Sequence, residues 1–495
     1  MNDEKLQPTA PNTEVVVVGG GPAGMMLAAE LTLANVDVVV IERRETQDLE
    51  SPRARGLHAR TIEVLDQRGI ADRFLAAGTP MQVQAFAGIP LDISDFPTRH
   101  NYGLALLQSD FERIMAGWLA ELGVRIMRDC EVTDFTSHDD HVEVTLADGT
   151  SLCAGYLVGC DGSRSLVRKK AGIEFAGWDP TVCWITAEVE MREQPEFGMR
   201  GGGGIGPAEG GRVGVTLSEL DPDARSHEPT LADLRAALMR VDGTDYGAHS
   251  PRYISRFTDM TRQAVTYCAE RVLIAGDAAH VHAPLGGQGL NLGVQDSVNL
   301  GWKLAQVVHG TSPNTLLDSY EAERHPVAAD VMRNTMAQRA LSATDDRTVA
   351  LRDIVAELLT LDEARRSVAG MISGLDIRYR PDDDHHHPIV GRRVPDLELK
   401  TANGTTTVYE HLHDAKALLI DLEPTSDRDP RLWSERVKHI VGTYSGPWGL
   451  PIVGSVQPPS ALLVRPDGYV AWAGTGTSDG LHEALTTWFG APSRP

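Results

Sequence analysis

The sequence predicts an α/β fold with three parts: a doubly wound, mostly parallel sheet, an antiparallel sheet inserted into it, and a further C-terminal α/β domain. Three observations predict this order. A strand, a glycine-rich turn, a helix and a second strand follow one another near the N-terminus. Alternating apolar and polar residues mark an antiparallel sheet between about residues 175 and 267. A buried apolar strand returns at residues 271–275.

The composition limits the class of protein. The chain has 495 residues, with 46 Lys and Arg against 69 Asp and Glu, and a formal net charge of −23. The length suggests several domains, and the acidic balance argues against nucleic acid or an anionic membrane as the main partner. Five scattered cysteines exclude a disulfide framework and the usual zinc spacings. Without a signal peptide or a long apolar run, we expect a cytoplasmic protein.

The N-terminal unit follows from three patterns. After a polar lead over residues 1–13, residues 14–18 form a short apolar run typical of a buried strand. Residues 25–34 carry leucines on one helical face, and residues 36–41 form a second apolar strand. A strand–helix–strand unit of this kind begins a parallel sheet with a right-handed crossover.

The remaining elements follow from the period of the apolar residues. Helical spacing predicts helices, and alternation bounded by turns predicts strands. The predicted helices are 61–77, 110–122, 289–309 and 481–489, and the predicted strands are 142–146, 156–158, 185–191, 213–217, 417–420, 437–441 and 461–464.

The first turn has the pattern GxGxxG at Gly19, Gly21 and Gly24. Such glycines allow a tight turn, the close approach of a pyrophosphate and close helix–strand packing, and a helix N-terminus favours phosphate. Glu42 lies at the tip of the second strand, where a carboxylate accepts hydrogen bonds from ribose hydroxyls and repels a 2′-phosphate. The turn therefore predicts FAD or NAD rather than NADP. The run GGGGIG at residues 201–206 fits the same pattern, but it lacks the flanking strand and helix and is interpreted as a loop.

A second glycine-rich cluster narrows the choice of cofactor. Gly276-Asp277 follows the strand at residues 271–275, and residues 284–291 read PLGGQGLN. A carboxylate at a strand tip can hold a polyol hydroxyl, and the N–H groups of a glycine-rich helix start can face an electron-accepting ring. FAD has both a ribityl chain and such a ring, whereas NAD has no ribityl chain. We therefore expect FAD.

Three motifs occur in order: GxGxxG at residues 19–24, CDGSRSLVR at 160–168 and GDAAH at 276–280. Together they resemble class A flavoprotein monooxygenases of the para-hydroxybenzoate hydroxylase fold. More narrowly, the chain is similar over essentially its whole length to actinobacterial aromatic-polyketide hydroxylases and related antibiotic-modifying monooxygenases. The resemblance implies a GR2-type FAD-binding domain, an inserted substrate-binding sheet and a thioredoxin-like domain. Their expected limits are 14–174 with 268–394, 175–267 and 395–495, respectively.

The resemblance also implies which residues hold FAD. On the adenosine and phosphate side they are Gly19, Gly21, Ala23, Gly24, Glu42, Arg43 and Val132. On the ribityl and flavin side they are Arg53, Gln108, Asp277, Gly287, Leu290 and Asn291, and Asp161 is implied to touch both nucleotides indirectly. The substrate candidates are Arg55, whose neighbourhood resembles a segment facing flavin and substrate in relatives, and Trp184. For Arg55, a surface salt bridge is an equal alternative.

The implied reaction needs no protein nucleophile and no metal, because FAD carries the chemistry. The family reduces FAD with NADPH or NADH, adds O2 to form a flavin C4a-hydroperoxide, and transfers a hydroxyl group to an electron-rich aromatic ring. The chain shows no obvious tyrosine pair that would deprotonate a small phenol. We therefore expect a larger, polycyclic aromatic small molecule as substrate, and a monomer or homodimer as the working form.

Other functions remain open. The same fold could perform a Baeyer–Villiger reaction, inactivate an antibiotic, or bind flavin as a scaffold without turnover. The 199–206 loop is either a lid or a surface turn. The tail from residue 395 has no cysteine, which excludes dithiol exchange there.

Several histidines and one cysteine could suggest a metal site or reactive groups, but we interpret them as structural. The run DDDHHH at residues 382–387 is interpreted as a linker rather than a metal site. His280 and His282 are interpreted as packing around the flavin loop rather than as a proton relay. Cys160 is interpreted as a small buried thiol.

Overall fold

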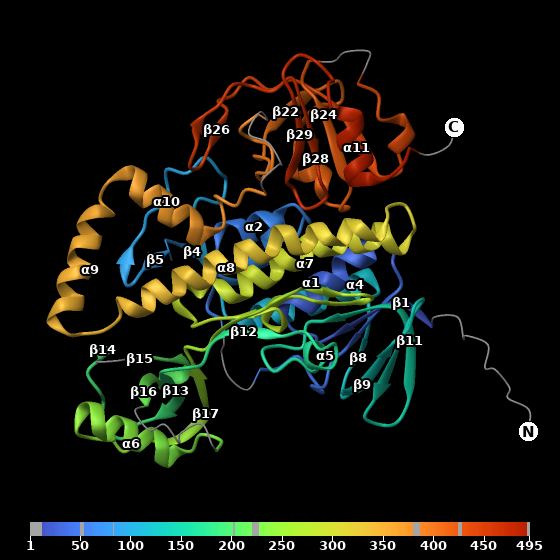
Figure 1. Ribbon diagram of the computed structural model, residues 1–495. Coiled ribbons are helices and arrows are strands. Elements are labelled where there is room, and N and C mark those ends of the chain that lie inside the picture. The colour runs from blue at the N-terminus through green and yellow to red at the C-terminus, as the bar shows by residue number, and fades with distance from the viewer. Residues whose placement is uncertain are drawn as a thin grey trace, which may run out of the picture.

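The computed structural model describes residues 12–49, 54–82, 84–200, 203–219, 227–379, 387–423 and 428–492. Figure 1 shows a central body of sheet and long helices, a small lobe that contains α6 and β13 to β17, and a C-terminal domain on the opposite side of the body. The α/β class and the order of the three parts agree with the prediction. The residue limits of the domains stay predictions.

The body is built on a sheet whose main strands run in the order β19-β20-β11-β1-β2-β8. All pairs from β20 to β8 are parallel, and β1 lies between β11 and β2, as a doubly wound sheet requires. β9 and β10 extend the sheet from β11 in antiparallel fashion. The bounds are β1 Thr13–Val18, β2 Val38–Ile41, β8 Arg125–Met127, β9 Val132–Ser137, β10 Val142–Leu146, β11 Ser151–Gly159, β19 Cys268–Ala269 and β20 Val272–Ile274.

Long helices bury the sheet. α1 (Pro22–Leu33) packs against α4 (Gln108–Leu122) and α7 (Gln288–Val308), and α7 also packs against α2 (Ala59–Asp66) and α8 (Asp318–Ala340). α9 (Asp346–Leu358) and α10 (Asp362–Ser373) extend the helical layer at one side of the body (Figure 1). In the described part of the chain, no helix has both the length and the apolarity needed to cross a membrane.

One predicted helical segment is divided in two. The apolar spacing over residues 61–77 predicted helix, and the chain forms α2 and then α3 (Ala71–Ala77) there. Gly69 adopts a left-handed φ of +70° between them. Because glycine takes this conformation without strain, it ends α2 and redirects the chain.

Short strands complete the body. Three of them belong to the segment of chain between β2 and α4. There, β3 (Gly56–Leu57) and β4 (Thr79–Met81) both pair with β7 (Gly103–Ala105). The other short elements are β5 Ala85–Phe86, β6 Ile89–Pro90, α5 Leu166–Lys170, β12 Phe175–Trp178, β18 Thr261–Ala264 and β21 His280–Val281. β12, β18 and β21 form a separate antiparallel sheet that ties the inserted segment to the loop after β20.

The inserted lobe is a five-stranded antiparallel sheet with the order β14-β15-β16-β13-β17. Its strands are β13 Cys183–Glu190, β14 Gly198–Arg200, β15 Gly203–Pro207, β16 Val213–Glu219 and β17 His249–Thr258. Ile185, Ala187 and Val189 are buried in one core with the apolar face of α6 (Leu231–Asp242). The alternation predicted for this sheet is confirmed, and Trp184 lies on the face away from this core.

The predicted loop at residues 199–206 is wrong in part. Its described residues belong to the β14–β15 hairpin, in which Gly204 lies opposite Thr216 of β16. A Cβ on Gly203 would overlap the Thr216 carbonyl oxygen, so the glycine permits the strands to approach. Residues 203–206 of the run therefore belong to the strand β15, and they do not form a second dinucleotide turn.

The C-terminal domain has a mixed four-stranded sheet of order β25-β24-β28-β29. Its strands are β24 Ala417–Asp421, β25 Val437–Val441, β28 Ala461–Val464 and β29 Val470–Gly474, and α11 (Leu481–Phe489) packs against β29. Two small hairpins accompany it: β22 Glu398–Thr401 with β23 Gly404–Thr407, and β26 Gly449–Leu450 with β27 Gly454–Ser455. The strands and helix predicted for the tail are confirmed.

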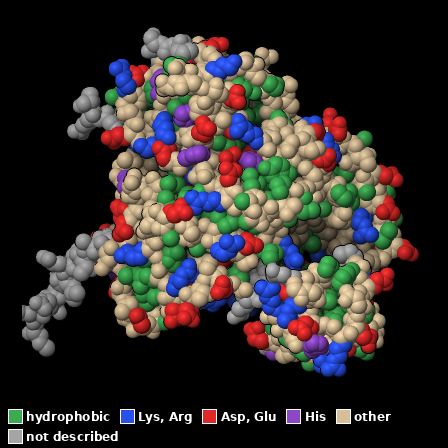
Figure 2. Space-filling view, turned by 180° about the vertical axis from the view of Figure 1, so that it is seen from behind, with side chains coloured by type: hydrophobic (Ala, Val, Ile, Leu, Met, Phe, Trp, Pro, Cys, Tyr) green, Lys and Arg blue, Asp and Glu red, His purple; other side chains and the backbone are tan. Residues whose placement is uncertain are grey.

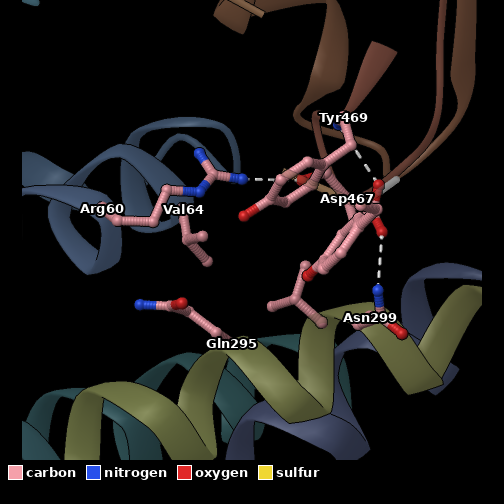
Figure 3. Close-up of a pocket in the computed structure, with 8 residues that line it drawn as sticks. Arg60, Val64, Gln295, Asn299, Asp467 and Tyr469 are labelled. Carbon is pink, nitrogen blue, oxygen red and sulfur yellow. Dashed lines mark hydrogen bonds between the residues drawn. The ribbon is translucent and has the colours of Figure 1, made fainter. Parts of the chain in front are cut away.

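Buried charged groups join this domain to the body. Arg465 pairs with Glu323 of α8 at 2.8 Å and with Asp467 on its own turn; Arg465 and Asp467 are buried, and the Glu323 side chain is 9% exposed. Figure 3 shows the adjoining contacts, where Arg60 of α2 donates to the Asp467 carbonyl at 2.8 Å and Asn299 of α7 faces the Asp467 carboxylate. Such an interface, with buried charges contributed from both sides, fixes the two parts against each other.

A small cavity of about 10 Å³ lies at this junction, bordered by Arg60, Gln295 and Tyr469 (Figure 3). Arg60 Nε and Gln295 Oε1 are buried and have no hydrogen-bond partner among the described residues. Because a cavity of this size holds one water and buried polar groups are nearly always satisfied, we expect one ordered water there. A high-resolution crystal structure checks this, and empty density between these two side chains would contradict it.

Candidate active site

The first glycine turn is shaped by contacts that exclude side chains at two of its three glycines. A Cβ on Gly19, which has a φ of +108°, would overlap the Cys160 carbonyl oxygen, and one on Gly24 would overlap the Gly19 carbonyl oxygen. Around a Cβ built on Gly21, by contrast, no atom of the described residues lies within 4 Å. Gly21 is the N-cap of α1, so this open side faces the free N–H groups of a helix start. The geometry fits a cradle for a diphosphate.

Glu42 lies beside this turn at the end of β2. Its buried carboxylate accepts hydrogen bonds from the Gly20 N–H at 2.6 Å and from the Arg44 N–H at 2.8 Å. Burial alone would raise the pKa of Glu42, but these hydrogen bonds and the Arg44 charge lower it below its ordinary value. Glu42 is therefore ionised, as the predicted role of accepting hydrogen bonds from ribose hydroxyls requires. The side chain of Arg43 is exposed.

A polar network extends from the turn to α4, and most of its residues are not predicted from the sequence. Arg44 donates to Glu112 at 3.0 Å and to the Gly20 carbonyl at 3.2 Å. Gln108 donates to Glu112 at 2.8 Å, and its Oε1 accepts the Ala54 N–H at 3.2 Å. Gln108, a predicted site residue, is thus held beside the turn by Glu112, which lies one helical turn away on α4. That spacing was the only available signal for Glu112.

Of the other predicted cofactor residues near this turn, Val132 is described by the structure and Arg53 is not. Val132 is buried at the start of β9, shortly after Cys130, whose N–H donates to the Glu42 carbonyl at 3.1 Å. Arg53 lies outside the described residues. Ala54, which follows it, is described and reaches Gln108 as above.

The Asp161 motif connects the two glycine turns. Asp161 accepts the N–H groups of Leu166 and Val167 at 2.7 and 3.1 Å, which orders the start of α5. Arg168 of α5 donates to the Ala278 carbonyl at 2.8 Å, next to the second turn. The Cys160 N–H donates to the Val18 carbonyl at 2.8 Å, just before the first turn. Burial raises the pKa of the Cys160 thiol, as expected for an inert side chain.

The two glycine turns converge although more than 250 residues separate them. A Cβ on Gly276 would lie 3.0 Å from the Ala23 side chain, and Gly276 has a φ of +61°. Ser297 of α7 donates to the Ala23 carbonyl at 2.8 Å, which fastens the helix of the second turn to the first turn. The Asp277 side chain is exposed beside this contact. The arrangement fits one long ligand that reaches both turns.

The loop before α7 is held by His58, a residue not predicted from the sequence. The His58 N–H donates to Asn291 Oδ1 at 2.8 Å, and His58 Nε2 lies 2.7 Å from the Gly286 carbonyl oxygen. Asn291 also donates to the Gly287 carbonyl at 2.9 Å. Burial lowers the pKa of His58, so its ring is neutral near pH 7. Leu290 is half-buried in the first turn of α7.

The two substrate candidates lie on different parts of the fold. Arg55 is exposed just before β3, next to the Gln108 region. Trp184 is half-buried and stacks on Phe257 of β17, with ring centroids 5.3 Å apart. The Arg339 guanidinium, at the end of α8, lies 5.5 Å from the centre of the Trp184 ring. Figure 2 shows a hollow between the lobe that carries Trp184 and the body.

The structure describes His280 and part of the acidic and histidine run at residues 382–387. His280 Nε2 contacts the buried Asp296 at 2.6 Å, which agrees with the packing interpretation. Residues 382–386 of the acidic and histidine run lie outside the described residues, and His387 contacts the Gln457 carbonyl at 2.8 Å. Among the described residues, no group of three or more His, Cys, Asp or Glu is arranged to hold a metal ion.

The chain matches two protein families and several characterised proteins. The FAD binding domain family matches residues 12–335, and the family described as aromatic-ring hydroxylase, C-terminal, matches residues 387–492. The 12-dehydrotetracycline 5-monooxygenase/anhydrotetracycline 6-monooxygenase of Streptomyces rimosus is 42% identical over 513 residues, which cover 97% of this chain and 99% of that protein. The rifampicin monooxygenase of Streptomyces venezuelae is 42% identical over 496 residues, with the same coverage.

Solved structures of related proteins have the same fold as this chain. The OxyS anhydrotetracycline hydroxylase from Streptomyces rimosus has a TM-score of 0.90 at 42% identity, over 97% of this chain and 100% of that one. The Diels-Alderase PyrE3 has a TM-score of 0.83 at 36% identity, with the same coverage of both chains. This chain therefore belongs to the FAD-dependent aromatic monooxygenases, with FAD as its cofactor and NAD(P)H as the reductant typical of the family.

Proposed function

We propose that this enzyme hydroxylates an aromatic polyketide or a related polycyclic phenol, using FAD, O2 and NADH or NADPH. The observation that carries the proposal is the convergence of the Gly19–Gly24 turn and the Gly276–Asp277 turn, fastened by Ser297 and Arg168. Bound FAD, reduced by NADH or NADPH, would activate O2, so that one oxygen atom enters the substrate and the other leaves as water. The residues of this chain bind it, orient it and exclude water.

We assign the adenosine and diphosphate side of FAD to the first turn. Gly19, Gly21, Ala23 and Gly24 form the turn, and the open side of Gly21 gives the diphosphate access to the α1 N-terminus. The ionised Glu42 accepts hydrogen bonds from the ribose, with the exposed Arg43 beside it. Val132 contacts the adenine. Arg53 is assigned to the diphosphate or ribityl region, in keeping with its place before Ala54.

We assign the ribityl chain and the ring to the second turn and the loop after it. Gln108 and Asp277 hold the ribityl hydroxyls. Gly287, Leu290 and Asn291 face the ring, where N–H groups at the α7 N-terminus stabilise negative charge on the reduced flavin. Asp161 acts indirectly, since its carboxylate is bound to the α5 backbone. His58 holds this loop through Gly286 and Asn291.

The substrate enters the hollow between the body and the inserted lobe (Figure 2). Trp184 and Phe257 offer two stacked rings on one face of the inserted sheet, which suits a flat, polycyclic aromatic molecule. Arg55 reaches the substrate from the body. We place the enzyme in the cytoplasm, working as a monomer or homodimer.

Two other outcomes have support among the relatives. One relative is named as a monooxygenase of rifampicin, so an antibiotic-inactivating oxygenation of this chain's own substrate, by hydroxylation or by a Baeyer–Villiger reaction, is the second candidate. The Diels-Alderase is a relative named for a cyclisation, so a flavin-binding protein without oxygen transfer is the third. All three share the FAD site and differ in what happens to the substrate.

One experiment separates these outcomes. Purified enzyme is incubated with NADH or NADPH under 18O2 and a panel that includes anhydrotetracycline, rifampicin and an angucyclinone. We expect bound FAD, NAD(P)H oxidation stimulated by one substrate class, and a product that gains one labelled oxygen atom on an aromatic ring, located by NMR. Oxygen inserted beside a carbonyl, or a rearranged product of unchanged oxygen content, would overturn the hydroxylase proposal.

A further inference from the structure

A buried cluster of charged side chains lies behind the second glycine turn, and no FAD-contacting role accounts for it. Asp296 of α7 is 0% exposed. Its Oδ2 accepts the Gly276 N–H at 3.2 Å and contacts His280 Nε2 at 2.6 Å, while its Oδ1 accepts Arg324 Nε at 2.8 Å. The carboxylate thus joins the backbone of the turn to α8. Burial alone would raise the pKa of Asp296, but His280 and Arg324 lower it.

Arg324 connects this carboxylate to the junction with the C-terminal domain. It is also 0% exposed, and its NH1 donates to the Tyr379 hydroxyl at 3.0 Å. The Tyr379 ring packs on Tyr469 of the C-terminal domain, with centroids 4.3 Å apart. The residue before Arg324 on α8, Glu323, pairs with Arg465 at 2.8 Å. Two consecutive residues of α8 therefore hold the turn on one side and the C-terminal domain on the other.

Stability alone does not explain such a cluster. A buried ion pair gains little over apolar residues of the same size, because the desolvation of both charges offsets their attraction. What it does supply is a defined geometry for the group to which it is bound. Here that group is the N–H of Gly276, a residue in the left-handed conformation whose neighbour Asp277 has an exposed side chain. The cluster fixes the backbone from which Asp277 projects.

We propose that Asp296, Arg324 and Tyr379 are positioning residues that hold the Gly276–Asp277 turn in the conformation that binds the ribityl chain. The inference rests on the proposed assignment of Asp277 to FAD. Its consequence is that FAD affinity depends on a tyrosine hydroxyl outside the three nucleotide-binding motifs. It also gives the cysteine-free C-terminal domain a role, because Tyr469 and Arg465 support Tyr379 and α8 from behind.

The chain offers a matched pair of variants to test this. Tyr379→Phe removes the hydroxyl that accepts from Arg324 and keeps the ring that packs on Tyr469. Tyr469→Phe removes a hydroxyl from the same ring pair, and in the described residues no hydrogen bond joins that hydroxyl to Arg324. Holoenzyme and deflavinated protein of each are compared by FAD titration, by visible circular dichroism of the bound flavin and by thermal melting.

We expect Tyr379→Phe to raise the dissociation constant of FAD by about 3- to 10-fold, within the range of the net contribution of one ordinary intramolecular hydrogen bond, and to change the flavin dichroism. Tyr469→Phe should bind FAD within about twofold of wild type. Unchanged affinity and dichroism in Tyr379→Phe would overturn the inference. So would equal weakening in both variants that follows their loss of melting temperature, since that indicates only a structural junction.

A third variant separates this inference from the site assignment. Asp277→Ala tests whether the turn contacts FAD through that carboxylate. If Asp277→Ala weakens FAD binding and Tyr379→Phe does not, the positioning role fails and the site assignment stands. If Tyr379→Phe weakens binding and Asp277→Ala does not, the assignment of Asp277 fails, while the turn remains under the control of Tyr379.

Discussion

Replacing Gly21 with alanine should leave the fold intact and remove FAD, whereas replacing Gly24 with alanine should damage the fold itself. A methyl group on Gly21 meets no described atom within 4 Å, and Gly21 has a φ of −82°, which alanine adopts easily. It would, however, occupy the space assigned to the diphosphate. A methyl group on Gly24 overlaps the Gly19 carbonyl oxygen, where both partners belong to the tightly packed turn. Overpacking of this kind costs about 1–3 kcal/mol or more.

The measurement pairs the FAD-to-protein ratio of each purified variant with its melting temperature after FAD has been removed. We expect Gly21→Ala to melt like the deflavinated wild type and to retain almost no FAD. Gly24→Ala should melt lower or fail to accumulate. Full FAD retention by Gly21→Ala would show that the diphosphate lies elsewhere.

Replacing Arg465 with methionine should cause the largest loss of stability among single substitutions at the domain junction. It leaves Glu323 and Asp467 buried without their main partner, and removal of one member of a buried ion pair typically costs 3–5 kcal/mol. Lys303 still faces Glu323 at 2.8 Å, so we expect about 3 kcal/mol. Urea unfolding of the holoenzyme measures this loss. Arg73→Met, at the exposed Arg73–Glu121 pair, is the control and should leave the urea midpoint unchanged.

The Arg465–Glu323 ion pair also predicts how the stability of the protein depends on pH. Burial alone would raise the pKa of Glu323, but Arg465 and Lys303 hold it down at about 2, against 4.5 for the free side chain. A lowered pKa in the folded state stabilises the protein above pH 4.5, and this contribution is lost as the pH falls from 4.5 towards 2. In Arg465→Met, the loss of stability across that window should be smaller. An equally steep loss in the variant would contradict the assignment to Glu323.

The sequence predicted those parts of the site that depend on local spacing. The roles of Gly19, Gly21 and Gly24 follow from a turn between a strand and a helix, and all three glycines lie where that pattern requires. The parallel pairing of the first two strands could be anticipated because a right-handed strand–helix–strand unit leaves few alternatives. The convergence of the two turns was expected from the motifs.

The missed residues act through contacts that local spacing does not encode. Asp296 and Arg324 lie within helical patterns, where a charged residue ordinarily indicates a solvent-facing side, yet both are fully buried against each other. His58 reaches Gly286 across more than 220 residues. The β14–β15 hairpin escaped detection because one residue, Ile205, carries its apolar alternation, and pairing with β16 decides its conformation.

The order of the strands along the chain has a consequence for synthesis. β1 and the first turn leave the ribosome early, but β20 and the second turn follow only after the whole inserted lobe, and Ser297, which fastens the two turns, comes later still. A nascent chain that ends before α7 therefore lacks half of the cofactor pocket. With FAD assigned to both turns, we expect flavin capture to come late in synthesis, and a purified chain truncated before α7 should carry no flavin.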